Sequence, residues 1–116
     1  MDIGVWMSTE VLSDKLQARQ ENNTEQAWNL SRWPKGFTQE GDHRLFVASK
    51  GAWRGCFTLS REALFSPNDL SAPYTLLFDT RTWTPIRAVP VKHFRGFTYN
   101  VPTENSADTL PPQKSR

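Results

Sequence analysis

The sequence predicts an α+β fold: a small, mostly antiparallel sheet that curls toward a barrel, with two N-terminal helices. Three observations lead to this prediction. The chain has 116 residues, which is enough for one ordinary domain but not for two. Its longer helix signals come before residue 37, and strand patterns separated by turn signals follow from residue 41. Early helices followed by sequential strands are typical of α+β domains with partly closed sheets. We expect one domain over residues 1–102.

The chain opens with a predicted strand and a predicted helix. The strand covers Ile3–Met7, where β-branched and aromatic residues follow one another directly. Ser8 or Thr9 then supplies a helix N-cap, and acidic Glu10 lies in the first turn. We expect this helix to run to about Gln20. One side carries a narrow apolar stripe made of Val11, Leu12, Leu16 and Ala18.

A second, shorter helix is predicted to follow. Asn23 can cap it, with Gln26 at the reciprocal capping-box position. Pro34 and Gly36 would end it, because the residue before a proline is pushed out of the helical region. Its buried side would consist of Ala27, Trp28 and Leu30.

The rest of the domain reads as strands. The predicted strands are Arg44–Ala48, Arg54–Leu59, Tyr74–Phe78, Trp83–Val91 and Arg95–Val101. Lys50-Gly51 supplies the turn of a hairpin between the first two, and Glu62–Phe65 fits one helical turn. The continuous apolar run Tyr74–Phe78 predicts a strand that is buried on both faces. Pro85 and Pro90 cannot donate to a ladder, so their strand is expected at an edge or beside a bulge.

Composition predicts whether the C-terminal residues are ordered and in which cellular compartment the protein is found. Residues 103–116 contain no aromatic residue and one large aliphatic residue, so we expect a disordered polar tail. Cys56 is the only cysteine, which excludes an intramolecular disulfide and suits a reducing compartment. No stretch approaches the roughly 20 apolar residues of a membrane span. We therefore predict a cytoplasmic protein that does not associate with membranes.

Charge is unevenly distributed along the chain. The formal net charge is +2. Residues 1–31 hold two basic and five acidic residues, whereas residues 32–100 hold ten basic and five acidic ones. A basic middle is the electrostatic pattern of a phosphate-binding face, although an ordinary solvated surface would give the same pattern.

Aromatic residues lie next to basic residues at several points in the sequence. These points are Trp33-Pro34-Lys35, Trp53-Arg54 and the run from Lys92 to Phe97. Aromatic faces stack on bases while Lys and Arg hold phosphates, so this combination suits unpaired or flipped nucleotides. The alternative is that the rings fill the ends of a small barrel while the cations reach solvent. The predicted nucleic-acid-binding residues are Trp33, Lys35, Lys50, Trp53, Arg54, Lys92, Phe94 and Arg95.

Catalytic and metal motifs give no strong prediction. His43 and His93 stand far apart, and a single cysteine cannot form a zinc cluster with them. The chain contains no Gly-rich phosphate loop and no nucleophile elbow. We therefore predict neither a metal nor a cofactor.

The stretch Gly41–Ala48, followed by Arg54–Leu59, resembles the core of the PUA-like superfamily, which includes the PUA, ASCH and EVE domains. Members share a glycine–acid pair that opens a strand, then a turn, then a strand that begins with glycine. The segments around Phe78–Ile86 and Val89–Phe97 are similar to the closing strands of such barrels. The resemblance implies a pseudo-barrel that binds RNA or modified bases in a cleft beside the early helices. The implied lining is the region Trp28–Lys35, Trp53 and the segment Phe94–Phe97.

Two further functions stay open. Some ASCH members hydrolyse acylated cytidine with Lys, Thr and Glu, which suggests Lys35, Thr38 and Glu40 here, although their order and spacing depart from the family pattern. A hydrolase would require the three side chains to converge on one cleft. The other alternative is a protein-interaction or inhibitor module without catalysis, because an exposed aromatic patch serves a protein partner equally well.

Overall fold

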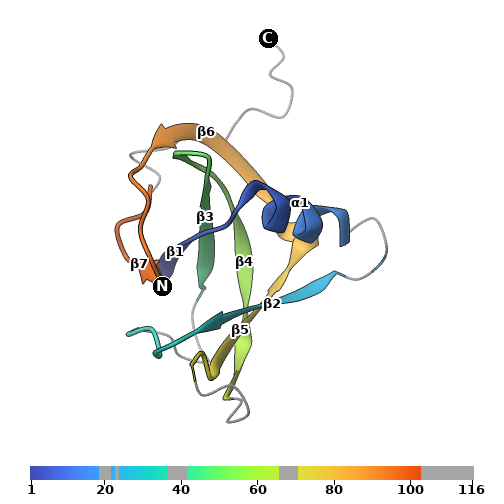
Figure 1. Cartoon of the computed structure of the whole chain (residues 1–116). Helices are drawn as coiled ribbons and strands as arrows, with labels where there is room; N and C mark the ends of the chain where they lie inside the picture. The colour runs from blue at the N-terminus through green and yellow to red at the C-terminus, as the bar shows by residue number, and fades with distance from the viewer. Residues whose placement is uncertain (19–21, 23, 37–41, 66–70, 103–116) are drawn as a thin grey trace.

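A computed structural model gives the fold of the chain. It describes residues 1–18, 22, 24–36, 42–65 and 71–102, and for residues 61–65 the backbone alone. The predicted tail, residues 103–116, lies outside the described residues. The elements are β1 (Asp2–Trp6), α1 (Thr9–Ala18), β2 (Glu25–Leu30), β3 (Arg44–Ser49), β4 (Ala52–Phe65), β5 (Tyr74–Asp79), the short 3₁₀ helix η2 (Thr80–Thr82), β6 (Thr84–Pro90) and β7 (Phe97–Thr98). Figure 1 shows them as a curled half-barrel sheet with α1 beside it.

The sheet is organised around β4, its longest strand. The strand order is β2-β5-β4-β3-β1-β7, and β6 also pairs with β4. The first half of β4 pairs with β3 and β6, whereas its second half pairs with β5. All pairs are antiparallel except β1 with β3. The prediction of a mostly antiparallel, curled sheet is confirmed, and the parallel pairing of β1 with β3 adds to it.

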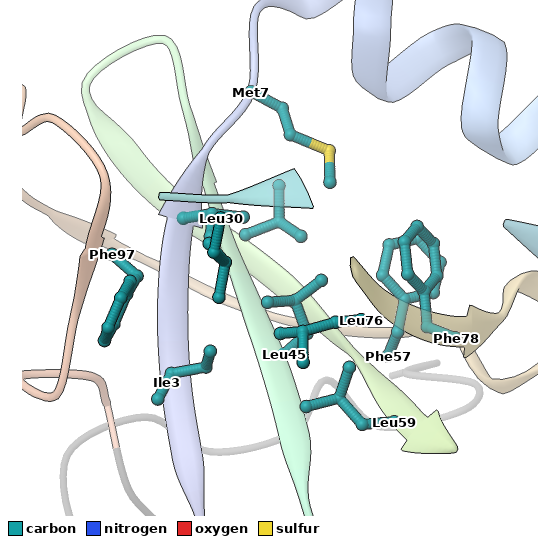
Figure 2. Packing of buried hydrophobic residues seen from close by; sticks show 11 residues of the cluster. Ile3, Met7, Leu30, Leu45, Phe57, Leu59, Leu76, Phe78 and Phe97 are labelled. Carbon is teal, nitrogen blue, oxygen red and sulfur yellow. The ribbon is translucent and has the colours of Figure 1, made fainter. Parts of the chain in front are cut away.

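The concave side of the sheet holds the main hydrophobic core. Its members are Ile3, Val5, Met7, Leu30, Leu45, Val47, Phe57, Leu59, Leu76, Phe78 and Phe97. Figure 2 shows the rings of Phe57 and Phe78 next to each other, with centroids 4.5 Å apart. Every second residue of β1 and β3 contributes to this core, as the two-residue side-chain period of a strand requires.

A second cluster covers the opposite face of β1, β3 and β4. Its buried members are Phe46, Ala48, Trp53, Cys56 and Ile86. Because both faces are covered, β3 is almost entirely buried. From the sequence, Tyr74–Phe78 and not β3 is the strand predicted to be buried on both faces. In β5 only Leu76 and Phe78 are buried, in alternation, so that expectation was wrong.

Helix α1 packs with its apolar stripe on the main core. The Ser8 hydroxyl accepts a hydrogen bond from the Val11 amide over 3.1 Å, which confirms Ser8 as the N-cap. Val11, Leu12 and Leu16 contact the core, as predicted. The described helix ends at Ala18, and the predicted end at Gln20 lies outside the described residues.

The second predicted helix is wrong, because residues 25–30 form strand β2. Along β2, Gln26, Trp28 and Leu30 are at least partly covered while the residues between them are exposed, which is the period of a strand. All six residues pair with β5. This long-range pairing overrides the local capping signals at Asn23 and Gln26. Asn23 lies outside the described residues.

The predicted helical turn over Glu62–Phe65 is wrong as well. The backbone there continues β4 and pairs with β5, after a register shift between Leu59 and Ala63. The predicted edge position of the proline-bearing strand is confirmed, since β6 pairs with β4 alone among the described strands. No described helix is long and apolar enough to cross a membrane.

Candidate functional site

An open cleft of about 330 Å³ lies between the end of β2 and the segment that leads into β7. We call it the aromatic cleft. It is lined by Trp6, Trp28, Asn29, Leu30, Ser31, His93, Phe94, Arg95 and Gly96. Two stretches far apart in the sequence, 28–31 and 93–96, therefore form its two walls. Residues 28–31 and 94–96 belong to the lining that the family resemblance implied, whereas His93 does not.

Trp6 joins the two walls. It is the last residue of β1, and its neighbour Val5 points into the main core, so the Trp6 ring faces the other way. The ring meets His93 edge-on, with centroids 4.7 Å apart and planes at 67°. It meets Phe94 at 5.8 Å and 85°. These edge-to-face contacts fix the indole at the junction while leaving it half-buried.

The charge of the aromatic cleft is positive. Arg95 is exposed at its mouth. Among the described residues that line the cleft, none is acidic. Gly96 has a φ of 69°, a left-handed backbone that glycine adopts without strain and that turns the chain into β7. The cleft thus combines three half-buried rings with a cation.

Two contacts extend the walls beyond the cleft. Arg32 follows Ser31 on one wall, and its guanidinium lies 4.9 Å from the ring centre of Phe97, which follows Gly96 on the other. Further on, the Lys35 amide donates a hydrogen bond to the Tyr99 hydroxyl over 2.7 Å. The loop after β2 is thereby joined to the segment around β7 by side chains.

Tyr99 and Trp33 are the large hydrophobic residues most exposed in the described part of the chain, at 47% and 38%. Tyr99 meets Phe97 edge-on at 5.6 Å. Trp33 meets Tyr74 at 5.3 Å and 61°. Trp33 and Lys35, two of the predicted binding residues, lie at the surface two and four residues after Ser31 of the cleft wall.

A second basic group lies at the turn between β3 and β4. Arg54 donates from Nε to the Ser49 carbonyl over 2.8 Å and from Nη2 to the Lys50 carbonyl over 3.0 Å. Its guanidinium therefore stabilises the turn. Lys50 is exposed in that turn. The Val91 amide bonds to the Gly51 carbonyl, which brings Lys92 next to the same turn.

The position of Trp53 differs from the expectation that it stacks on a base. Trp53 is 3% exposed and belongs to the second cluster. Its ring meets Phe94 at 5.6 Å and Phe46 at 6.4 Å, and it also covers Gly4. No base can reach a ring that is buried in this way. The turn glycine Gly51 suggested exposure, but Gly4, two strands away, leaves the space that the indole fills.

The predicted catalytic set is only partly described. Lys35 is exposed, whereas Thr38 and Glu40 lie outside the described residues. Their convergence stays a prediction. In the described ranges, no three His, Cys, Asp or Glu side chains are grouped so that they could hold a metal ion.

A separate polar cleft of about 560 Å³ lies at the other end of β2. It is lined by Thr24, Glu25, Thr58, Leu59, Ser60, Phe78, Asp79, Arg81 and Thr82. Arg81 and Asp79 form an ion pair of 2.7 Å, and this hydrogen-bonded guanidinium lowers the pKa of the Asp79 carboxyl. Arg81 neutralises the nearest acid, so this cleft lacks the one-sided charge of the aromatic cleft.

Besides Arg81, whose pKa is raised by its hydrogen bonds with Asp79, Lys15 is a cation with a perturbed pKa. Partial burial lowers the pKa of its ammonium, against the opposing effect of Asp14. Its Nζ donates to the Gln26 side-chain oxygen over 3.3 Å and to the Ala27 carbonyl over 3.2 Å. Lys15 therefore joins α1 to β2 and takes no part in the aromatic cleft.

Trp6, His93 and Tyr99 are the residues that sequence reasoning missed. Trp6 could have been found from the alternation in β1, since an inward Val5 directs its neighbour outward. Tyr99 carried no local signal besides its place near the end of the basic and aromatic run. Comparison of the chain with family models, with curated proteins and with solved structures finds no match.

Proposed function

We propose that the aromatic cleft binds a single-stranded stretch of RNA or DNA, and that the protein is a nucleic-acid-binding module of the PUA-like kind. The observation that carries the proposal is the meeting of three half-buried rings, Trp6, Trp28 and Phe94, with Arg95 in one open cleft. Rings of this kind stack on bases of any sequence, and the cation offsets phosphate charge.

The charge around the cleft supports the same ligand. Arg95 lies on one wall and Arg32 follows the end of the other. Lys35 is exposed three residues after Arg32, and Lys92 is exposed directly before His93, on the side of the β3–β4 turn. A phosphate backbone would meet cations on both sides. Because no described lining residue is acidic, nothing in the lining itself repels a phosphate.

The shape of the site favours an unpaired strand over a duplex. The cleft volume of about 330 Å³ lies at the lower end of the range for small-ligand sites, so it accommodates a base rather than a helix. In a duplex the base faces are covered by their neighbours. Only an unpaired or flipped base can offer a face to Trp28 or Phe94.

Fluorescence anisotropy with labelled single-stranded RNA, single-stranded DNA and duplex DNA tests the proposal. The wild-type protein is expected to bind one single-stranded polymer more tightly than the duplex. Arg95→Gln removes a cation from the aromatic cleft and should weaken binding by about 5- to 30-fold. Arg81→Gln is the matched control, because it removes the same charge from the polar cleft.

Failure to bind any of the three polymers at low salt would reject the proposal. Equal losses from Arg95→Gln and Arg81→Gln would also count against it, because a general charge effect would then explain the binding. Circular dichroism spectra of both variants should match that of the wild type, since Arg95 and Arg81 are exposed.

A protein partner is the second candidate, and strand β2 favours it. The Thr24 carbonyl faces the side of β2 on which β5 lies, because it accepts from the amide of Thr80, the residue after β5. The Ala27 carbonyl faces the other way, toward Lys15. The backbone groups of Glu25 and Asn29 therefore point to the same edge as those of Ala27, where no described strand pairs with β2 and where Lys15 covers the Ala27 carbonyl. Such an edge can accept a strand from another protein. If hydrogen–deuterium exchange at β2 slows when a protein ligand is added but not when an oligonucleotide is added, this candidate is favoured.

A further inference from the structure

We propose that Tyr99 is a second stacking position and that Arg32 contacts the phosphate between it and the aromatic cleft. The inference rests on the proposed function and adds the size of the ligand. The bound species is then an oligonucleotide of at least two unpaired nucleotides, not a single free nucleotide.

The first step is that the site continues past the cleft. One wall ends at Ser31 and is followed by Arg32, and the other ends at Gly96 and is followed by Phe97. Arg32 and Phe97 meet across the gap at 4.9 Å. A strand that leaves the cleft in this direction must cross the Arg32 guanidinium, which can hold a phosphate in a bidentate way.

The second step is the distance to the next ring. Tyr99 comes three residues after Gly96, so it lies at most about 10 Å further along the chain. Tyr99 is 47% exposed, more than any other large hydrophobic residue in the described ranges. One nucleotide beyond the cleft would find this ring within reach.

The third step is that the Tyr99 ring is held in a fixed orientation. Its hydroxyl accepts from the Lys35 amide over 2.7 Å, and its ring packs edge-on against Phe97 at a right angle. A ring fixed at both ends loses little side-chain entropy when a base stacks on it.

Affinity measured for a mononucleotide, a dinucleotide and longer homopolymers of the preferred type tests the inference. The wild type should bind the dinucleotide clearly more tightly than the mononucleotide. Tyr99→Ala should weaken binding of the longer ligands by about 5- to 150-fold and leave the mononucleotide unchanged. Tyr99→Phe is the matched control, because it loses the hydrogen bond to Lys35 but keeps the ring, and it should bind within a few-fold of the wild type.

The outcomes separate this inference from the proposed function. If the wild type binds no oligonucleotide, the proposed function fails and this inference fails with it. If the wild type binds but Tyr99→Ala has no effect on the longer ligands, only this inference is rejected. If Tyr99→Phe weakens binding as much as Tyr99→Ala, the hydrogen-bonded loop and not the ring is responsible, which also overturns it.

Discussion

Gly4 lies directly beneath the indole ring of Trp53. A Cβ at position 4 would come within 2.6 Å of Cζ3 of that ring and within 2.8 Å of Cγ1 of Val101. The two residues come from β1 and β4, which are separated by β3 in the sheet. The absence of a side chain at Gly4 thus leaves the space in which Trp53 packs within the second cluster.

Gly4→Ala should destabilise the protein by about 1–3 kcal/mol, because the added methyl group overpacks the second cluster. Urea denaturation followed by tryptophan fluorescence measures the loss. In a Trp53→Leu background, where the large ring is gone, the same substitution should cost clearly less. An equal cost in both backgrounds would show that Trp53 is not the residue responsible.

Phe57 and Phe78 should stabilise the main core as a coupled pair. Both are almost fully buried and their ring centroids are 4.5 Å apart. Phe57→Leu and Phe78→Leu should each lower the free energy of unfolding by about 1–2 kcal/mol. The double variant should lose about 0.5–1.5 kcal/mol less than the two losses together, since the ring contact is removed only once. Additive losses in urea denaturation would contradict this pairing.

Cys56 should react slowly with thiol reagents in the native protein. Its side chain is 7% exposed, and burial raises the pKa of the thiol, although Arg44 acts in the opposite direction. The reactive thiolate is therefore scarce and covered. We expect DTNB to react at least about tenfold faster in guanidinium chloride than in buffer. Equal rates would mean that the second cluster opens readily.

Asp79 should stabilise the fold at neutral pH and lose this effect in acid. Its hydrogen bonds with Arg81 hold the pKa of the carboxyl below the ordinary value of 3.8. A carboxyl with a lowered pKa contributes stability above its ordinary pKa, and the contribution disappears as the pH falls through the lowered value. Asp79→Asn should therefore cost a small amount near neutral pH and less at about pH 3, because the pair is exposed. A cost that grows in acid would contradict the sign.

The sequence was most informative where a local pattern and its surroundings agreed. Ser8 and the stripe Val11, Leu12 and Leu16 predicted the start and the packing face of α1. Arg44–Ala48 was recognised as a strand because its apolar run is flanked by turn signals. Its antiparallel pairing with β4 across the Lys50-Gly51 turn agrees with the predicted hairpin. Its parallel pairing with β1 is set by contacts between residues about 40 positions apart and could not be derived locally.

The errors have one physical cause. Residues 23–30 carry the capping pair Asn23 and Gln26 and three apolar residues, which favour a helix in isolation. Pairing with the whole length of β5 favours a strand and prevails. The expected exposure of Trp53 is wrong for the same reason. Its burial depends on Gly4 in β1, and β1 does not pair directly with β4. Both outcomes depend on tertiary contacts, which local propensity does not encode.

The salt dependence of oligonucleotide binding tests the central claim most directly. The logarithm of the binding constant for the preferred single strand is measured against the logarithm of salt concentration for the wild type, Arg95→Gln and Arg81→Gln. Each phosphate contact contributes a slope of about −0.7 on a single strand. The account predicts that Arg95→Gln makes the slope shallower by about one contact while Arg81→Gln leaves it unchanged. Identical slopes for all three proteins, or no binding at the lowest salt, would contradict a nucleic-acid site in the aromatic cleft.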